Sequence, residues 1–201
     1  NNKDLKILSA WDEFLQALNS YDKSGEAKNI EEKIKYTYEA IEHAEKSIAL
    51  DKKLTDSYNV LASCLFFLRL ESSLQHDRDK NESRFKEVAE KSYILDPYNP
   101  DSVMNMAYLY RISDDEVKYK EFVNKAVDIN PHHPRSLLAK GMLYLNECDY
   151  DKSIELLNRA HESNRKTVPF YELMLLFCHL GKNDWSSANQ SVDRSMREND
   201  H

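Results

Sequence analysis

The chain has 201 residues, of which 41% are hydrophobic and 31% are charged. This balance is typical of a folded, water-soluble protein and excludes a chain that is disordered by composition. The net charge of −7 argues against direct contact with nucleic acid, because neutralising phosphates requires a basic face. With only three glycines, phosphate-binding loops and tightly turning strands are not expected.

The first predicted element is a helix that carries Trp11, Phe14, Leu15 and Leu18 and breaks at 19–28 around Gly25. A second helix is predicted to begin after Asn29, which is spaced from Glu32 as in a capping box. This second helix is expected to run past Ala40, Ala44 and Ser47 to Leu50. The two helices form a predicted first unit at 5–54.

The second predicted unit, 55–99, also consists of two helices. The first is marked by Tyr58, Ala62 and Leu65, and the second by Phe85, Ala89 and Ser92. The unit is longer than those that follow, and its surplus residues fall in the polar, charged stretch 71–83. We expect this stretch to be an elongated connection between the two helices.

Prolines then mark unit boundaries with one spacing. Pro97 and Pro131 are 34 residues apart, and so are Pro100 and Pro134. The first pair is expected to stop a helix, because proline disfavours α geometry in the residue before it. The second pair suits the first turn of a helix, where the missing N–H costs nothing, and Asn99 is a predicted N-cap. These boundaries predict a third unit at 100–133 and a fourth at 134–167.

Other residues keep the same period through a fifth unit, 168–199, which has one extra residue near Lys182. Small and apolar residues recur at Ala107, Gly141 and Leu175, and tyrosine or cysteine recurs at Tyr110, Tyr144 and Cys178. Inside a unit the spacing is helical, with Leu137, Gly141 and Tyr144 at i, i+4 and i+7. Each unit is therefore predicted to be a helix, a short turn and a second helix.

This pattern resembles the tetratricopeptide repeat. Residues 134–167 match it with Leu137, Gly141, Tyr144, Ser153, Leu157 and Ala160, although Arg165 stands where a closing proline is expected. The resemblance implies an all-α fold, a right-handed superhelical solenoid of about five helix-turn-helix repeats. The whole chain, 1–201, would then be a single repeat domain.

The resemblance also implies that first helices line a concave face, where the family binds a peptide or helix of a partner. Placing the sequence in this register gives ten candidate partner-binding residues: Asn59, Ser63, Met104, Asn105, Tyr108, Arg135, Leu138, Met142, Glu172 and Leu176. Their Met, Tyr and Leu side chains would supply apolar contacts, and Asn and Arg would bind backbone or carboxylate groups. Packing against adjacent helices is the alternative role for the same residues.

Catalytic, cofactor and metal sites are not expected. His132 and His133 form the one histidine pair, but no further ligands are spaced to complete a metal site. The motif Gly-x-Ser-x-Gly is absent, and Asp114 and Asp115 are expected to open a helix rather than to act as paired acids. We interpret the chain as a binding protein that is not an enzyme.

The three cysteines, Cys64, Cys148 and Cys178, lie far apart without a Cys-x-x-Cys pair. We interpret all three as small buried hydrophobic side chains in a reducing, cytoplasmic environment. No apolar run approaches the ~18 residues that cross a bilayer, so no membrane contact is expected.

Two functional hypotheses remain open. Residues 10–62 are similar to the repeat region that follows the winged-helix domain of some OmpR/ToxR-type transcription regulators, through Ala10-Trp11, Ala40, Ala44 and the run 47–51. This similarity implies an effector or oligomerisation region whose DNA contacts lie upstream, which would explain an acidic chain that begins without methionine. The alternative is a self-standing adaptor or chaperone for secretion or pilus assembly. In both hypotheses the partner is a protein or peptide, and a homodimer is left open.

Overall fold

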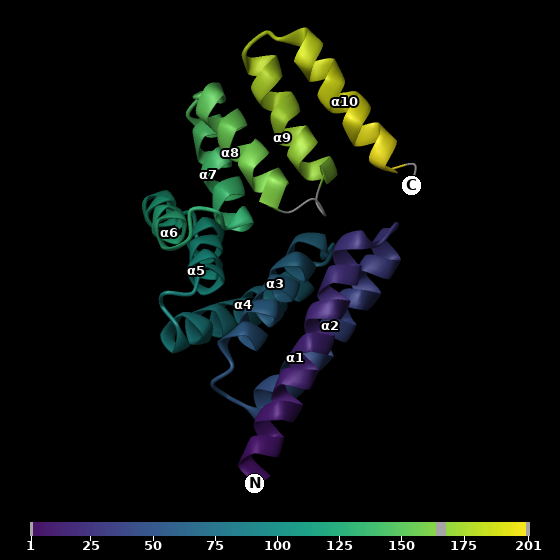
Figure 1. Ribbon diagram of the computed structural model, residues 1–201, viewed down its shortest axis with the longest axis vertical. Helices are drawn as coiled ribbons and strands as arrows, with labels where there is room; N and C mark the ends of the chain where they lie inside the picture. Colours follow the sequence, from purple (N-terminus) through teal and green to yellow (C-terminus); the bar gives the residue numbers. More distant parts are fainter. Residues whose placement is uncertain (1, 164–167, 200–201) are drawn as a thin grey trace. The chain divides into compact units, whose positions relative to one another are not determined.

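The computed structural model describes residues 2–163 and 168–199, and within these ranges it contains ten α-helices and no strand (Figure 1). The predicted all-α fold class is confirmed. The chain forms two compact units, residues 1–114 with α1 to α5 and residues 115–201 with α6 to α10. Arg165, the predicted closing position of the fourth repeat, lies outside the described residues. No helix in the described ranges is both long enough and apolar enough to cross a bilayer.

Unit 1 is a stack of helical hairpins. Its helices are α1 (Asn2–Glu26), α2 (Ile30–Leu50), α3 (Thr55–Glu71), α4 (Gln75–Leu95) and α5 (Pro100–Ile112). Each helix packs on the next one in sequence, and α3 also contacts both α1 and α5. Contact between alternate helices is the packing expected when neighbouring hairpins cover each other's apolar faces.

Unit 2 repeats this arrangement. Its helices are α6 (Glu116–Ile129), α7 (Pro134–Asn146), α8 (Tyr150–Ser163), α9 (Val168–Gly181) and α10 (Trp185–Asn199). Consecutive helices pack together, and α7 also contacts α9. A buried core joins α7, α8 and α9 through Leu137, Leu156, Leu157, Ala160, Tyr171, Met174, Leu175 and Cys178.

Gly141 allows the close approach of α7 and α8. A Cβ atom at this position would lie 3.1 Å from Cγ of Leu157, closer than side chains normally approach. The hydroxyl of Ser153 on α8 donates to the carbonyl of Gly141 at 2.8 Å. The small residue that recurs with the sequence period therefore lies at a helix–helix crossing.

The predicted proline and cap positions are confirmed. Helices α5 and α7 begin at Pro100 and Pro134, while α4 and α6 end two residues before Pro97 and Pro131. The Asn99 side chain accepts from the backbone N–H groups of residues 101 and 102, at 2.9 and 3.3 Å. Asp115 and Asn29 cap α6 and α2 in the same way. The carboxylate of Glu32 accepts from the N–H of Lys28, so only the Asn29 half of the predicted capping box forms as expected.

Two predicted connections are wrong. Helix α1 continues through Gly25 to Glu26, so the first hairpin has a short turn where a break over 19–28 was expected. Helix α4 begins at Gln75, so most of 71–83 is helical and the second unit's surplus residues lengthen α4. Long charged side chains favour this outcome, because Glu, Lys and Arg are good helix formers and Arg69 pairs with Glu82 at 2.7 Å across α3 and α4.

Most of the large apolar residues that mark the first predicted helix are exposed. Trp11, Leu15 and Leu18 lie at the surface, whereas Ala10 and Ala17 are fully buried. The Ser47 hydroxyl of α2 donates to the carbonyl of Ala10 at 2.7 Å. The small residues of α1 thus face α2, and its large apolar residues face away.

A left-handed residue recurs in three turns. Asp114, Cys148 and Asn183 have φ of 55°, 59° and 59°, and they follow α5, α7 and α9 at intervals that match the sequence repeat. Cys148 is exposed in its turn, while Cys64 and Cys178 are buried. The prediction that all three cysteines are buried is therefore wrong for Cys148.

Candidate partner-binding site

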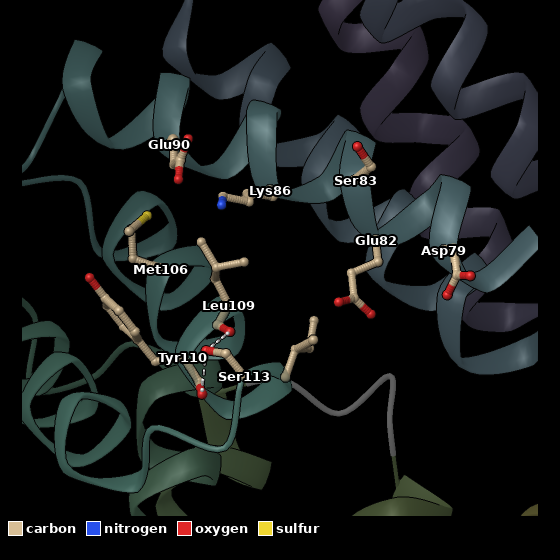
Figure 2. Close-up of a pocket in the computed structure, with 10 residues that line it drawn as sticks. Asp79, Glu82, Ser83, Lys86, Glu90, Met106, Leu109, Tyr110 and Ser113 are labelled. Atoms are coloured by element: carbon tan, nitrogen blue, oxygen red, sulfur yellow. Dashed lines mark hydrogen bonds between the residues drawn. The ribbon is translucent and has the colours of Figure 1, made fainter.

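Unit 1 contains a groove of about 610 Å³ between α4 and α5, which we call the α4–α5 groove (Figure 2). The two walls differ in chemistry. Helix α4 contributes Asp79, Glu82, Ser83, Lys86 and Glu90; α5 contributes Met106, Leu109, Tyr110 and Ile112, and Ser113 follows α5. A polar, mainly acidic wall thus faces an apolar one.

The groove follows from the lengths of the two helices. Helix α4 has 21 residues and α5 has 13, so the first turns of α4 extend beyond the point where α5 ends. Glu82 on this extension is held by Nε of Arg69 at 2.7 Å. At the end of α5, the Ser113 hydroxyl is within 3.2 Å of the carbonyls of Leu109 and Tyr110, which closes the last helical turn. Both edges of the groove are therefore anchored by hydrogen bonds.

The charges of the acidic wall favour a basic ligand. Three carboxylates, on Asp79, Glu82 and Glu90, accompany one ammonium group, on Lys86, and the Glu82 carboxylate is also paired with Arg69. Carboxylates on one side and apolar side chains on the other fit a segment that presents apolar residues beside Lys or Arg.

A second groove of about 360 Å³ lies between α2, α3 and α4 and is lined by Glu45, Ile48, Tyr58, Leu61, Arg84, Glu87, Val88 and Lys91. An ion pair between Arg84 and Glu45 crosses it. Because its two acidic and two basic side chains balance in charge, this groove offers less to a charged partner than the α4–α5 groove does.

Two of the sequence-predicted site residues meet in a buried hydrogen-bond network. Oδ1 of Asn59 accepts from Nδ2 of Asn105 at 3.0 Å and from the hydroxyls of Ser92 and Ser102 at 2.6 and 3.2 Å. Nδ2 of Asn59 donates to Oδ1 of Asn99 at 3.3 Å. The network joins α3, α4 and α5, so both asparagines contribute to the packing of neighbouring helices.

Comparison with known proteins assigns the fold. A family model described as the tetratricopeptide repeat matches residues 134–167. The chain is similar to TTC0263, a TPR protein of Thermus thermophilus, with 17% identity and a TM-score of 0.57 over 72% of this chain and 75% of that one. It is also similar to pilF of Pseudomonas aeruginosa, with 14% identity and a TM-score of 0.62 over 98% of this chain and 78% of that one.

Yeast Tom70 is a third similar structure, with 16% identity and a TM-score of 0.58 over 94% of this chain and 37% of that one. No curated protein matches the sequence. The fold is that of a tetratricopeptide repeat protein. These identities are low, so the likeness concerns the fold alone.

In the tetratricopeptide repeat register, the other predicted site residues differ in burial. Met104 is fully buried, and Glu172 is buried with Oε1 bound to Nε of Arg194 at 2.8 Å. Tyr108 stacks on Phe66 with ring centroids 4.8 Å apart. The residues that are neither fully buried nor fully exposed are Ser63, Tyr108, Arg135, Leu138, Met142 and Leu176. The partner-binding role of all ten residues stays a prediction.

Sequence reasoning missed the α4–α5 groove, although a signal for it was present. Gln75, Asp79, Glu82, Lys86 and Glu90 follow one another at intervals of three or four residues, which is the spacing of one helix face. Because 71–83 was interpreted as a connection, its residues were not assigned to one face of a helix. The helical spacing of these polar and charged residues was the signal that could have identified the acidic wall of the groove.

No histidine is among the residues that line the α4–α5 groove. The ring Nδ1 of His133 lies 2.6 Å from the hydroxyl of Ser136, which places the residue in the packing at the start of α7. Over 2–163 and 168–199, no three His, Cys, Asp or Glu side chains are placed to hold a metal ion together.

Proposed function

We propose that this chain is a protein-interaction scaffold that binds an amphipathic, basic segment of a partner protein in the α4–α5 groove. The observation that carries the proposal is the pairing of the apolar wall of α5 with the carboxylates of Asp79, Glu82 and Glu90 on α4. The proposal involves neither catalysis nor a cofactor, and it places the protein in the cytoplasm.

The size of the groove supports a short segment as the ligand. A volume of about 610 Å³ lies within the range of 300–1,000 Å³ that is typical of ligand pockets. It accommodates a few side chains rather than a folded domain. Leu109 and Ile112 would bury apolar side chains of the segment, and the carboxylates would attract its Lys or Arg groups and orient it.

A displayed library of random peptides tests the proposal even though the partner is unidentified. The intact protein should select sequences in which apolar residues alternate with Lys or Arg. The double variant Asp79→Lys with Glu90→Lys should weaken binding of a selected peptide by about tenfold, because two attractive contacts become repulsive.

Asp77→Lys with Glu87→Lys is the matched control, since it makes the same two charge changes on α4 at residues that do not line the α4–α5 groove. Selection of acidic peptides, or equal losses in the double variant and the control, would rule out the groove as the binding site. Circular dichroism on each variant checks that the helices are retained.

The two hypotheses from the sequence place this groove in different settings. In a regulator of the OmpR/ToxR type the bound segment would control a DNA-binding part, and in an adaptor for secretion or pilus assembly it would belong to a client. The reading frame upstream of Asn1 distinguishes them: a basic winged-helix segment favours the regulator, and a start codon near Asn1 favours the adaptor.

We extend the proposal to the half-buried first-helix residues of unit 2, Arg135, Leu138, Met142 and Leu176. Simultaneous Arg135→Ala and Met142→Ala should lower the affinity for a partner that also uses this face. Unchanged affinity would restrict binding to unit 1.

A further inference from the structure

Helix α1 has two apolar faces, and only one of them is covered. Ala10, Ala17 and Ser24 are buried on the side that contacts α2, where Thr37 donates to the Ser24 hydroxyl at 3.1 Å. The large apolar residues lie on the other side. Their exposed fractions are 62% for Leu8, 42% for Trp11, 55% for Leu15 and 36% for Leu18. We call these four residues the α1 stripe.

The spacing of the α1 stripe indicates that a helix covers it. Positions 8, 11, 15 and 18 are separated by three, four and three residues, which is the spacing of the a and d positions in a helix–helix seam. The neighbouring apolar residues Leu5 and Ile7 are also exposed, by 62% and 38%. Trp11 is held by an edge-on contact with Phe14, with ring centroids 5.5 Å apart, which gives the stripe a defined shape.

We infer that a second copy of this chain packs its own α1 stripe against this one, antiparallel and about a two-fold axis. The spacing is symmetric about residue 13, so an antiparallel pair places Leu8 opposite Leu18 of the second copy and Trp11 opposite Leu15 of the second copy. Every stripe residue then meets an apolar residue. Such self-complementarity is what a two-fold interface requires, since one surface must serve as both halves.

The exposed area of the α1 stripe agrees with this pairing. Asp4 and Asp22 stand at the two ends of the stripe, where the antiparallel pair brings Asp4 of one copy opposite Asp22 of the other, and this like-charge contact weakens the dimer. Leu5, Ile7 and the stripe together expose roughly 500 Å² per copy, so the pair would bury roughly 1,000 Å², the lower limit for a specific interface. The expected dimer is therefore one of moderate affinity that dissociates on dilution.

Helix α9 carries a comparable exposed stripe, Phe170, Leu173, Phe177 and Leu180. Packing of α1 from one copy on α9 of another would be head-to-tail and would extend into open chains. The α1–α1 pair closes on itself, as an α9–α9 pair with the same spacing of three, four and three residues would. Substitution in α9 therefore distinguishes the two pairs.

Sedimentation velocity of the full chain between 1 and 100 µM tests the inference, with these concentrations chosen to bracket a dimer of about micromolar affinity. The wild-type protein should shift from one chain mass to twice that mass. Leu15→Glu should raise the dissociation constant at least about 100-fold, because two carboxylates enter the centre of the apolar seam. Leu173→Glu should leave the dimer unchanged. A wild-type monomer at 100 µM, or a dimer abolished by Leu173→Glu but not by Leu15→Glu, overturns the inference.

Cross-linking tests the orientation. In a Cys148→Ser background, chains with Asp4→Cys and chains with Asp22→Cys are treated with a short bis-maleimide, separately and mixed. An antiparallel pair cross-links mainly in the mixture, because position 4 then lies opposite position 22 of the second copy. Cross-links within the separate samples and none that are specific to the mixture would contradict the antiparallel arrangement.

Discussion

Asn105 on α5 and Asn59 on α3, 46 residues apart in sequence, are joined by a hydrogen bond of 3.0 Å from Nδ2 of Asn105 to Oδ1 of Asn59. The same oxygen accepts from the hydroxyls of Ser92 on α4 and Ser102 on α5. Three donors from two helices thus converge on one buried acceptor. A satisfied buried network of this kind fixes the relative positions of the helices that share it.

The first prediction concerns this acceptor. The substitution Asn59→Ala leaves three buried donors without their acceptor, so the free energy of unfolding should fall by about 2–3 kcal/mol. Chemical denaturation followed by circular dichroism measures the change. Gln16→Ala, which removes an amide from an exposed position of α1, should cost less than about 0.5 kcal/mol. Equal effects of the two substitutions would show that the network contributes little to stability.

The helix boundaries that depend on backbone chemistry were predictable from the sequence. Pro100 and Pro134 begin helices and Asn99 caps one, because proline and asparagine act on the adjacent backbone whatever surrounds them. Gly25 misled the prediction, since a single glycine costs a helix only about 1 kcal/mol, which packing against α2 can outweigh. The stretch 71–83 misled it because polarity was taken as a sign of a connection, although Gln75, Arg78, Lys80 and Glu82 within it are good helix formers.

The candidate site was less predictable, because the sequence places a residue on a helix face without showing what covers that face. Asn59 and Asn105 belong to first helices as predicted, yet their side chains contact each other. Trp11 and Leu15 mark the first helix in the sequence, but the sequence does not show that both are exposed. The α4–α5 groove depends on the length of α4. The sequence interpretation assigned the first part of this helix to a connection.

The second prediction concerns the left-handed turn at Cys148. A residue with a Cβ atom at φ of 59° is strained relative to glycine, so Cys148→Gly should raise the free energy of unfolding by about 1 kcal/mol. The neighbouring Glu147 has φ of −83°, and Glu147→Gly should instead lower stability. Thermal unfolding of both variants measures the difference, and a destabilised Cys148→Gly variant would refute the strain argument.

The third prediction concerns pH. Burial raises the pKa of Asp56 above its usual range, the hydrogen bond from Asn99 lowers it in part, and the carboxylates of Asp101 and Asp96 raise it further. A carboxyl group with a raised folded-state pKa binds its proton more tightly when folded. It therefore favours folding at low pH, and this contribution is lost as pH rises through the folded pKa.

Asp56→Asn is nearly isosteric and keeps an oxygen that can accept from Asn99. It should raise the free energy of unfolding at pH 7 by less than about 1 kcal/mol, since Asp56 is only partly buried. The gain should vanish below about pH 4, where the carboxyl group is protonated in both the folded and unfolded states. Urea titrations at several pH values measure it, with Asp128→Asn on the exposed side of α6 as the control. A gain that is independent of pH would contradict this account.

The fourth prediction concerns thiol reactivity. Burial raises the pKa of Cys64 to about 12, and it also raises the pKa of Cys178, whereas Cys148 is exposed. Because the thiolate is the reactive form, a thiol with a pKa near 12 is ionised in only about one molecule in 10⁴ at pH 8. The folded protein should therefore react rapidly at one thiol per chain with an aromatic disulfide reagent, and at all three in denaturant. Cys148→Ser should abolish the rapid phase, and a rapid phase that persists in this variant would mean that α3 or α9 opens readily enough to expose its cysteine.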